Sequence, residues 1–279
     1  MERWDVAGTR FGTVAGLWRY PVKSLQGEAL VAGELSPQGL RGDRAFGIFE
    51  RSSEVLLSAK RIPQLLEGKA ALVAEGDSAV VAELSFGTTT LRSDDPAIHG
   101  ALSDWLGAGV ELRQPKAGRR SVVETQVDLD DDSQLAEFNT RPGLFFDSCV
   151  LNLVSITSLA AAAALYPAGA WAAERFRPNV LIETEPAIAE FSTDAEDRPG
   201  FVDDELVGFL VNLGSVEIVV MKRCDRCVMI TRPFGDLVRD RALLRTLSRF
   251  HGGEIGVDAM VNGTGRIGVG ETLTLLRRT

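Results

Sequence analysis

The first third of the chain is a series of short, strand-like segments separated by turns, and this pattern constrains the fold most strongly. The segments lie at 12–20, 28–35, 45–50, 54–58, 70–74, 79–84 and 88–92. Turn-forming residues separate them, as in Ser36-Pro-Gln-Gly39 and Glu75-Gly-Asp-Ser78. Short strands at this spacing are typical of an antiparallel barrel or sandwich, so we expect a β domain here.

The rest of the chain combines further strands with several helices. Helices are expected at 96–106, at 159–165 after the hydroxyl side chains of 155–158, and from about Arg239. Strands are expected at 110–113, 145–154, 180–182 and 216–222, with an extended segment at 228–231 and a final strand pair at 265–270 and 272–276. The polar segments 114–120 and 128–132 are typical of surface loops or a linker, so a domain boundary is expected near them. The expected fold class is mainly β, of the barrel type.

Composition restricts the compartment and the partners. A chain of 279 residues that is 45% hydrophobic can bury a sizeable core, whereas a net charge of -9 argues against a nucleic-acid-binding face. No apolar run has the length of a membrane-spanning helix, and the N-terminal residues lack the pattern of a secretory signal. Three cysteines do not make a disulfide framework. We therefore expect a cytoplasmic protein with free thiols and with no nucleic-acid or membrane partner.

The segment Met221-Lys-Arg-Cys-Asp-Arg-Cys-Val228 is the strongest candidate for a reactive centre. Two of the three cysteines stand three residues apart in it, beside Arg223 and Arg226. The thiolate is the form of cysteine that attacks electrophiles and binds metals, and neighbouring guanidinium groups lower the pKa of a thiol. The residues predict a cysteine that is ionised at neutral pH.

Cysteine pairs of this spacing also occur in structural zinc sites, in redox-active pairs and in buried cores. A structural zinc site needs four ligands, and the remaining candidates Cys149, His99 and His251 lack paired spacing. A thioredoxin-like pair should open a helix, but Cys227 is followed by Val-Met-Ile-Thr and then by a proline. Two inert core cysteines are common in proteins, although a core segment seldom carries this many charges. The residues by themselves do not exclude such a buried pair.

The chain resembles the MOSC-domain proteins, the molybdenum cofactor sulfurase C-terminal superfamily, preceded by the MOSC N-terminal β-barrel domain. The resemblance rests on six short motifs whose order and spacing are specific together: Tyr20-Pro-Val-Lys-Ser24, Gly39-Leu-Arg-Gly-Asp-Arg44, Leu57-Ser-Ala-Lys-Arg61, Arg175-Phe-Arg-Pro-Asn179, Cys224-Asp-Arg-Cys227 and Gly265-Arg-Ile-Gly-Val-Gly-Glu271. It implies an N-terminal barrel domain at 10–95 and a MOSC domain at 115–277. Within the superfamily the pattern is most similar to the mitochondrial amidoxime-reducing components and their bacterial relatives.

The resemblance implies a molybdenum cofactor and a set of residues that hold it. Cys227 matches the metal ligand and catalytic cysteine, and a thiolate joins naturally with the dithiolene sulfurs of the pterin. Eight further residues are implied to bind the pterin and its phosphate or to lie beside the metal: Lys23, Ser24, Arg44, Asp147, Arg177, Asn179, Asp225 and Arg226. Arginine suits this task because its guanidinium grips phosphate with two donors and stays charged. We expect these residues to converge on one pocket.

The implied activity is a molybdenum-dependent reduction of N-hydroxylated small molecules. The chain carries no ferredoxin domain, so we expect a separate electron donor of the ferredoxin, flavin reductase or cytochrome type. Two differences from the family pattern concern the substrate: Thr231-Arg-Pro-Phe-Gly235 contains an additional positive charge, and Asp258 replaces a tyrosine. Two alternatives stay open, a cofactor or sulfur carrier that uses a Cys227 persulfide, and a pathway-specific tailoring enzyme whose substrate is selected near Arg232 and Asp258.

Overall fold

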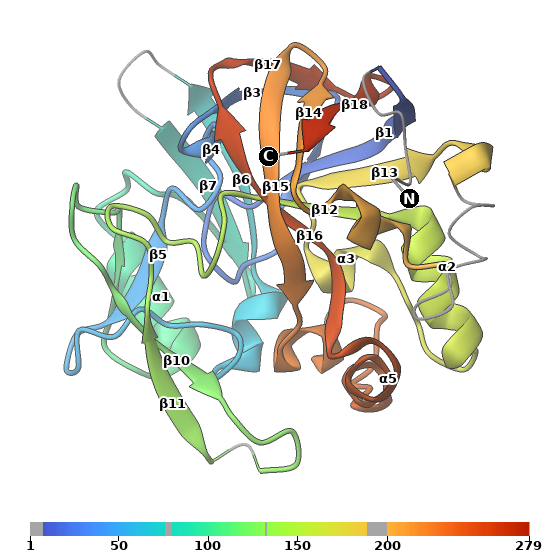
Figure 1. The fold of residues 1–279 in the computed structure, drawn as a ribbon. Coiled ribbons are helices and arrows are strands. Elements are labelled where there is room, and N and C mark those ends of the chain that lie inside the picture. The colour runs from blue at the N-terminus through green and yellow to red at the C-terminus, as the bar shows by residue number, and fades with distance from the viewer. Residues whose placement is uncertain (1–7, 76–79, 132, 189–199, 279) are drawn as a thin grey trace.

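A closed barrel of seven strands forms the centre of the fold (Figure 1). The computed structural model describes residues 8–75, 80–131, 133–188 and 200–278. The barrel strands, in order around it, are β13 (Val180–Thr184), β12 (Leu151–Ser155), β16 (Glu254–Asn262), β15 (Val216–Asp225), β14 (Phe209–Leu213), β18 (Thr272–Arg278) and β1 (Arg10–Arg19). The barrel closes because β13 pairs with β12 on one side and with β1 on the other. The prediction of a mainly β, barrel-type fold is confirmed.

The barrel interior is filled by side chains that alternate along each strand. In β15, Val216, Ile218 and Val220 are buried while Glu217 between them is exposed. Successive side chains of a strand point to opposite faces, so this alternation places one set of residues in the core. Beyond Val220 the alternation ends, and the register to β16 shifts twice before the strand finishes at Asp225. Such bulges bend a strand and redirect its side chains.

The first strand of the chain belongs to the same barrel as the last strands. In β1, Leu17 lies opposite Val180 of β13, and Thr13 lies opposite Thr272 of β18. Strand β2 (Glu28–Leu30) extends the sheet from β1. The barrel is therefore built from both ends of the sequence.

Smaller sheets beside the barrel carry the remaining strands. They are β17 (Gly265–Gly268) with β3 (Ala32–Ser36) and β4 (Gly39–Leu40), β5 (Gly47–Glu50) with β9 (Val110–Arg113), β10 (Val122–Gln126) with β11 (Leu135–Asn139), and β6 (Lys69–Glu75) with β7 (Val80–Phe86) and β8 (Thr89–Arg92). Apolar side chains of β5, β6, β7 and β9 form a second core, which includes Ile48 and Leu84. Leu35, Leu40 and Ile267 of the β17–β3–β4 sheet belong to the barrel core instead.

Helices are short and lie outside the barrel. They are α1 (Ile98–Leu106), α2 (Ile156–Leu165), α3 (Ala173–Phe176) and α5 (Ala242–His251), with the 3-10 helices η1 (Pro63–Glu67), η2 (Val202–Leu206) and η3 (Val228–Thr231). The Oγ of Ser155 accepts a hydrogen bond of 3.0 Å from the backbone N–H of Ser158, so a hydroxyl caps α2 as predicted. Over the part of the chain that the structure describes, no helix combines the length and apolar character needed to cross a membrane.

One predicted strand is wrong and another is shorter than predicted. Segment 54–58 is not a strand, because Glu54 adopts a left-handed φ of 59° and only Leu56 forms bridges, to Phe49 and Val123. Segment 145–154 forms a strand only from Leu151 onward.

Other expectations also differ from the structure. Segment 228–231 is the 3-10 helix η3, in which the Thr231 hydroxyl donates to the carbonyl of Val228 at 2.8 Å. Strands β17 and β18 do not pair with each other, since β17 pairs with β3 and β18 lies between β14 and β1. Strand β10 lies between the two polar segments expected as loop or linker, 114–120 and 128–132, and pairs with β11. Helix α5 begins three residues after Arg239.

Candidate functional site

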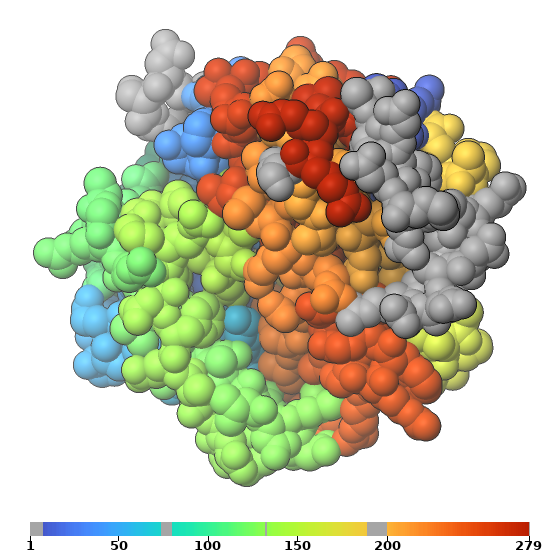
Figure 2. Space-filling view, viewed as in Figure 1, coloured from blue at the N-terminus to red at the C-terminus, as the bar shows by residue number. Residues whose placement is uncertain are grey.

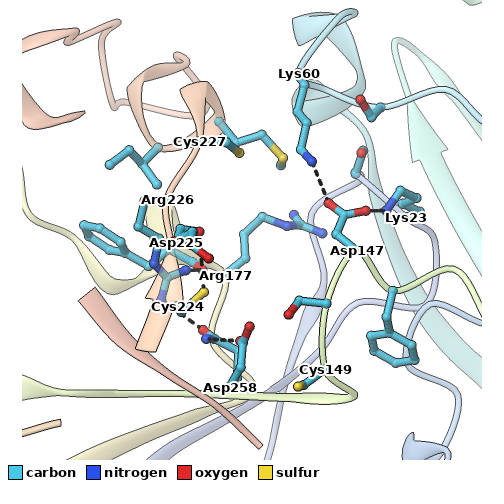
Figure 3. A pocket seen from close by; sticks show the side chains of 18 of the residues that line it. Lys23, Lys60, Asp147, Cys149, Arg177, Cys224, Asp225, Arg226, Cys227 and Asp258 are labelled. Atoms are coloured by element: carbon cyan, nitrogen blue, oxygen red, sulfur yellow. Dashed lines mark hydrogen bonds and ion pairs between the residues drawn. The ribbon is translucent and has the colours of Figure 1, made fainter. Parts of the chain in front are cut away.

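One cavity of about 430 Å³ brings the predicted site residues together (Figure 3). Its lining includes every residue that the resemblance implies: Lys23, Ser24, Arg44, Asp147, Arg177, Asn179, Asp225, Arg226 and Cys227. These residues come from the loops after β1 and before β5, from the loop before β12, and from the ends of α3 and β15. Residues more than two hundred positions apart in the chain therefore share one cavity.

A carboxylate with two ammonium groups forms one wall. Lys23 pairs with one oxygen of Asp147 and donates to the carbonyl of Phe145 at 2.9 Å, while Lys60 lies 2.8 Å from the other oxygen. Burial raises the pKa of Asp147, but the charges of Lys23 and Lys60 outweigh it and hold that pKa well below its usual range. Both lysines are buried, whereas 37% of the Asp147 side chain is exposed toward the open cavity.

The two lysines differ in their electrostatic surroundings. Burial lowers the pKa of Lys23, and the charge of Asp147 only partly opposes it. Burial also lowers the pKa of Lys60, but Asp147 and then the sulfur of Cys227 raise it, and the net shift is upward. Lys60 therefore lies within electrostatic reach of both Asp147 and Cys227 (Figure 3).

Ser24 supports this wall from behind. Its backbone has a left-handed φ of 72°, and its Oγ accepts a hydrogen bond of 3.0 Å from the N–H of Ala59. The neighbouring Ser58 donates from its hydroxyl to the carbonyl of Glu124 at 3.0 Å. These bonds fix the segment that carries Lys60, so Ser24 positions a neighbouring cation.

Arg44 and Arg177 share the aromatic ring of Tyr20. Their guanidinium carbons lie 4.9 and 4.2 Å from the ring centroid, distances at which a cation and an aromatic ring attract. Both residues have left-handed backbones, with φ of 48° and 51°. Strain of this kind in a residue other than glycine costs free energy and is concentrated at functional sites.

Arg177 carries a buried donor that nothing satisfies. Its Nη1 is enclosed and has no hydrogen-bond partner among the described residues. Burial lowers the pKa of Arg177 to about 10, and Arg44 adds to this effect. The side chain projects into the cavity, between Cys227 on one side and Asp147 on the other (Figure 3). A buried cationic donor without a partner is costly unless a ligand supplies an acceptor.

Asn179 connects three segments of the chain by side-chain hydrogen bonds. Its Nδ2 donates to Asp43 at 3.0 Å and to the carbonyl of Trp18 at 3.3 Å, and its Oδ1 accepts from the N–H of Asn152 at 3.2 Å. Asp43 also pairs with Arg44. Asn179 therefore holds Arg44 in place through Asp43.

The bulged end of β15 presents the cysteine segment. Arg226 donates to the carbonyls of Ile255 at 2.8 Å and Phe176 at 2.9 Å, and to Asn152 Oδ1 at 3.2 Å. Its donors thus fasten the segment to neighbouring strands and helices. Asp225 is 73% exposed and pairs with Lys222 at 2.8 Å. Cys227 follows as the N-cap residue of η3.

The three thiols are free and partly exposed. Cys224 and Cys227 both line the cavity, so they are not two cysteines sealed in the apolar core, although the Cys224 thiol is itself shielded from solvent. Neighbouring arginines do not ionise Cys224, because burial raises its pKa to about 12. Arg226 opposes this shift, but Asp258 reinforces it. Burial raises the pKa of Cys149 as well.

Lys60, Cys149 and Asp258 also line the cavity, although none of them was predicted to hold the cofactor. Lys60 lies inside the motif Leu57-Ser-Ala-Lys-Arg61, which was the available signal for it. Asp258 is buried on β16 and accepts a hydrogen bond of 3.1 Å from Asn152 Nδ2. The resemblance had marked Asp258 as a position near the substrate, whereas its place opposite Lys222 depends on strand register.

Arg232 lines neither this cavity nor its neighbour. The side chain is buried, and its Nη2 donates to the Lys60 carbonyl at 2.8 Å and to Gln126 at 2.6 Å. His99 and His251 are also absent from the cavity. Among the described residues, no group of three or more His, Cys, Asp or Glu side chains is placed to hold a metal ion.

Comparisons with known proteins identify two domains in the chain. Searching curated proteins gives no match. The YUAD protein from Bacillus subtilis is similar in structure, with 12% identity, a TM-score of 0.45 and coverage of 96% of this chain and 97% of that one. YiiM from Geobacillus stearothermophilus has 13% identity and a TM-score of 0.33, covering 58% of this chain and 73% of its own. The MOSC N-terminal beta barrel domain matches residues 11–99 and the MOSC domain matches residues 141–274, so this is a MOSC-domain protein that also carries the N-terminal beta barrel domain.

Proposed function

We propose that the cavity binds a molybdenum cofactor through the thiolate of Cys227, and that the protein reduces N-hydroxylated small molecules. MOSC domains are generally associated with this cofactor, which agrees with the domain match. The observation that carries the proposal is the cavity itself, where a free thiol and the unpaired Nη1 of Arg177 meet Lys23, Lys60 and Arg44.

The residues present fit an anionic, sulfur-ligated group. Cys227 is a free thiol just after β15, at the N-cap of η3, and a soft thiolate is a suitable ligand for molybdenum beside dithiolene sulfurs. Arg44 and Arg177 supply guanidinium groups that bind phosphate with two donors. In a protein whose net charge is -9, this concentration of cations would favour an anionic ligand.

Each of these cavity residues would have its own role in binding the cofactor. Arg177 would donate its free N–H groups to the ligand, and Asn179 would hold Arg44 beside it through Asp43. Asp147 would keep Lys23 and Lys60 oriented and charged. The bound cofactor would supply the two-electron chemistry that converts an N–OH group to N–H and water, with two electrons from a separate donor protein and two protons.

The first experiment measures molybdenum and pterin in protein made in a host that synthesises the cofactor. We expect about one molybdenum per chain in the wild type and a loss of bound metal in Cys227→Ser. Cys224→Ser is the matched control, because it removes a thiol of the same segment and should retain the metal. Wild-type protein without molybdenum, or equal metal content in both variants, would refute the proposal.

The second experiment measures turnover of an amidoxime with a chemical reductant. Reduction over many turnovers is expected for the wild type and for Cys224→Ser, and is expected to be lost in Cys227→Ser. A carrier that uses a Cys227 persulfide would instead give at most one equivalent of product per chain. Bound molybdenum without turnover of any N-hydroxylated compound would contradict the proposed reaction while retaining the cofactor.

A further inference from the structure

A second cavity, of about 660 Å³, borders the first at Cys227. Arg226 and Cys227 line both cavities. One wall of the second cavity is the tip of the β10–β11 hairpin at 126–129, the opposite wall is α5, and Val228 completes the lining. In Figure 2 the green hairpin region and the orange-red region of α5 lie next to each other on the same face of the molecule.

Helix α5 presents two different faces. Leu243, Leu247 and His251 are buried and recur every four residues, so they form the face that packs on the protein. The cavity is lined by the adjacent stripe, Leu244, Arg245, Ser248 and Arg249. Since positions four apart lie one above the other on a helix, Arg245 and Arg249 point to the same region.

The α5 side of the second cavity carries two arginines that can pair with an anionic ligand. Within the described ranges Arg249 has no ion pair with a carboxylate, and its guanidinium lies 5.0 Å from the Phe250 ring centroid. Arg245 pairs with Asp130, but both side chains are more than half exposed, so a ligand can replace this contact at little cost. The one carboxylate that the structure describes in the lining, Asp128, accepts a hydrogen bond of 2.7 Å from the N–H of Asp130.

Four of the other lining side chains are apolar. Val127, Leu129 and Leu244 belong to the two walls, and Val228 lies beside Cys227. The cavity therefore combines an apolar body, a positive rim on α5 and access to the candidate metal ligand. This combination suits a molecule with an apolar or aromatic body and one anionic end.

We infer that the second cavity is the substrate pocket and that it prefers N-hydroxylated compounds carrying a carboxylate. This inference rests on the proposed function. The carboxylate pairs with Arg249, assisted by Arg245, and the apolar body lies against Leu244. The N–O group then points toward Cys227 at the junction of the two cavities.

The test compares benzamidoxime with 4-carboxybenzamidoxime in the wild type and in Arg249→Gln. For the wild type, kcat/KM is expected to be higher for the carboxylated probe. In Arg249→Gln this preference should fall about tenfold, mainly through KM, because the ion pair between the guanidinium and the substrate carboxylate is lost. Arg92→Gln is the matched control, since Arg92 is an exposed, ion-paired arginine of β8 that lines neither cavity. An unchanged preference in Arg249→Gln would overturn the inference.

Calorimetric binding to the full chain provides a readout that does not need turnover. The Kd of 4-carboxybenzamidoxime should rise about tenfold in Arg249→Gln, while that of benzamidoxime and both values in Arg92→Gln stay unchanged. Binding that depends on Arg249 without turnover would support the pocket and contradict the proposed function. Turnover of both probes without any dependence on Arg249 would support the proposed function and contradict the substrate pocket.

Discussion

Lys60 Nζ and Asp147 Oδ2 lie 2.8 Å apart, and this contact joins the loop between β5 and β6 to the loop that leads into β12. Lys23 occupies the other oxygen of the same carboxylate. Two buried cations thus depend on one partly exposed acid for their compensation. Asp147 and these two lysines therefore set the charge of the cavity wall nearest to Cys227.

Asp147→Asn should therefore weaken the fold as well as the site. The amide cannot compensate Lys23 and Lys60, and we expect the free energy of unfolding to fall by about 2 kcal/mol in urea titrations. Asp94→Asn is the control, because it breaks an exposed pair with Arg92 and should leave the unfolding midpoint unchanged. Equal midpoints for both variants would show that Asp147 does not stabilise the wall.

Replacement by methionine should affect stability at Arg175 and metal binding at Arg177. Arg175 donates to the carbonyls of Ala170, Ile230 and Val238, so Arg175→Met should lower the free energy of unfolding by about 3 kcal/mol. Arg177 has an unpaired buried Nη1, so Arg177→Met should cost little stability in protein made without molybdenum but should lower the metal content of protein made with it. Thermal unfolding and metal analysis of both variants check this contrast.

Asp203 should make stability depend on pH. It is buried beneath the start of α2, accepts from the N–H of Ser155 at 3.1 Å, and has its pKa raised by burial to about 6. Because an unfolded aspartate titrates near about pH 4, the stability contributed by protonation is complete below that pH and is lost as pH rises through about 6. Asp203→Asn avoids this loss.

The measurement is the free energy of unfolding of wild type and Asp203→Asn at about pH 4 and about pH 7. The variant should gain about 3 kcal/mol relative to the wild type between these values. Asp94→Asn serves as a control, since Asp94 is exposed. A difference that does not change with pH would contradict the assignment to Asp203.

Cys224 should be unreactive toward iodoacetamide near neutral pH, because burial and then Asp258 raise its pKa to about 12. Asp258→Asn should accelerate its alkylation at about pH 9, whereas Asp225→Asn, which removes an exposed carboxylate paired with Lys222, should not. Peptide mass spectrometry separates the thiols, since trypsin cleaves after Arg226. Fast alkylation of Cys224 in the wild type would contradict this.

Local features of the sequence were sufficient for much of the fold. The alternation of Val216, Ile218 and Val220 identifies a strand with one buried face, and the hydroxyl of Ser155 identifies the start of α2. These signals depend on neighbours within a few residues. Pairing partners carry no such signal, which is why β17 and β18 were expected to pair although β17 joins β3.

The candidate site shows the same division. The sequence by itself determined that a thiol stands beside Arg226 in one segment and that other cations occur in short motifs. Only the tertiary structure decided that Arg177 keeps an unpaired donor in the cavity, that burial keeps Cys224 protonated, and that Arg232 is buried behind Lys60. The physical reason is that desolvation and hydrogen-bond satisfaction depend on groups brought together from distant positions, which local residue patterns do not encode.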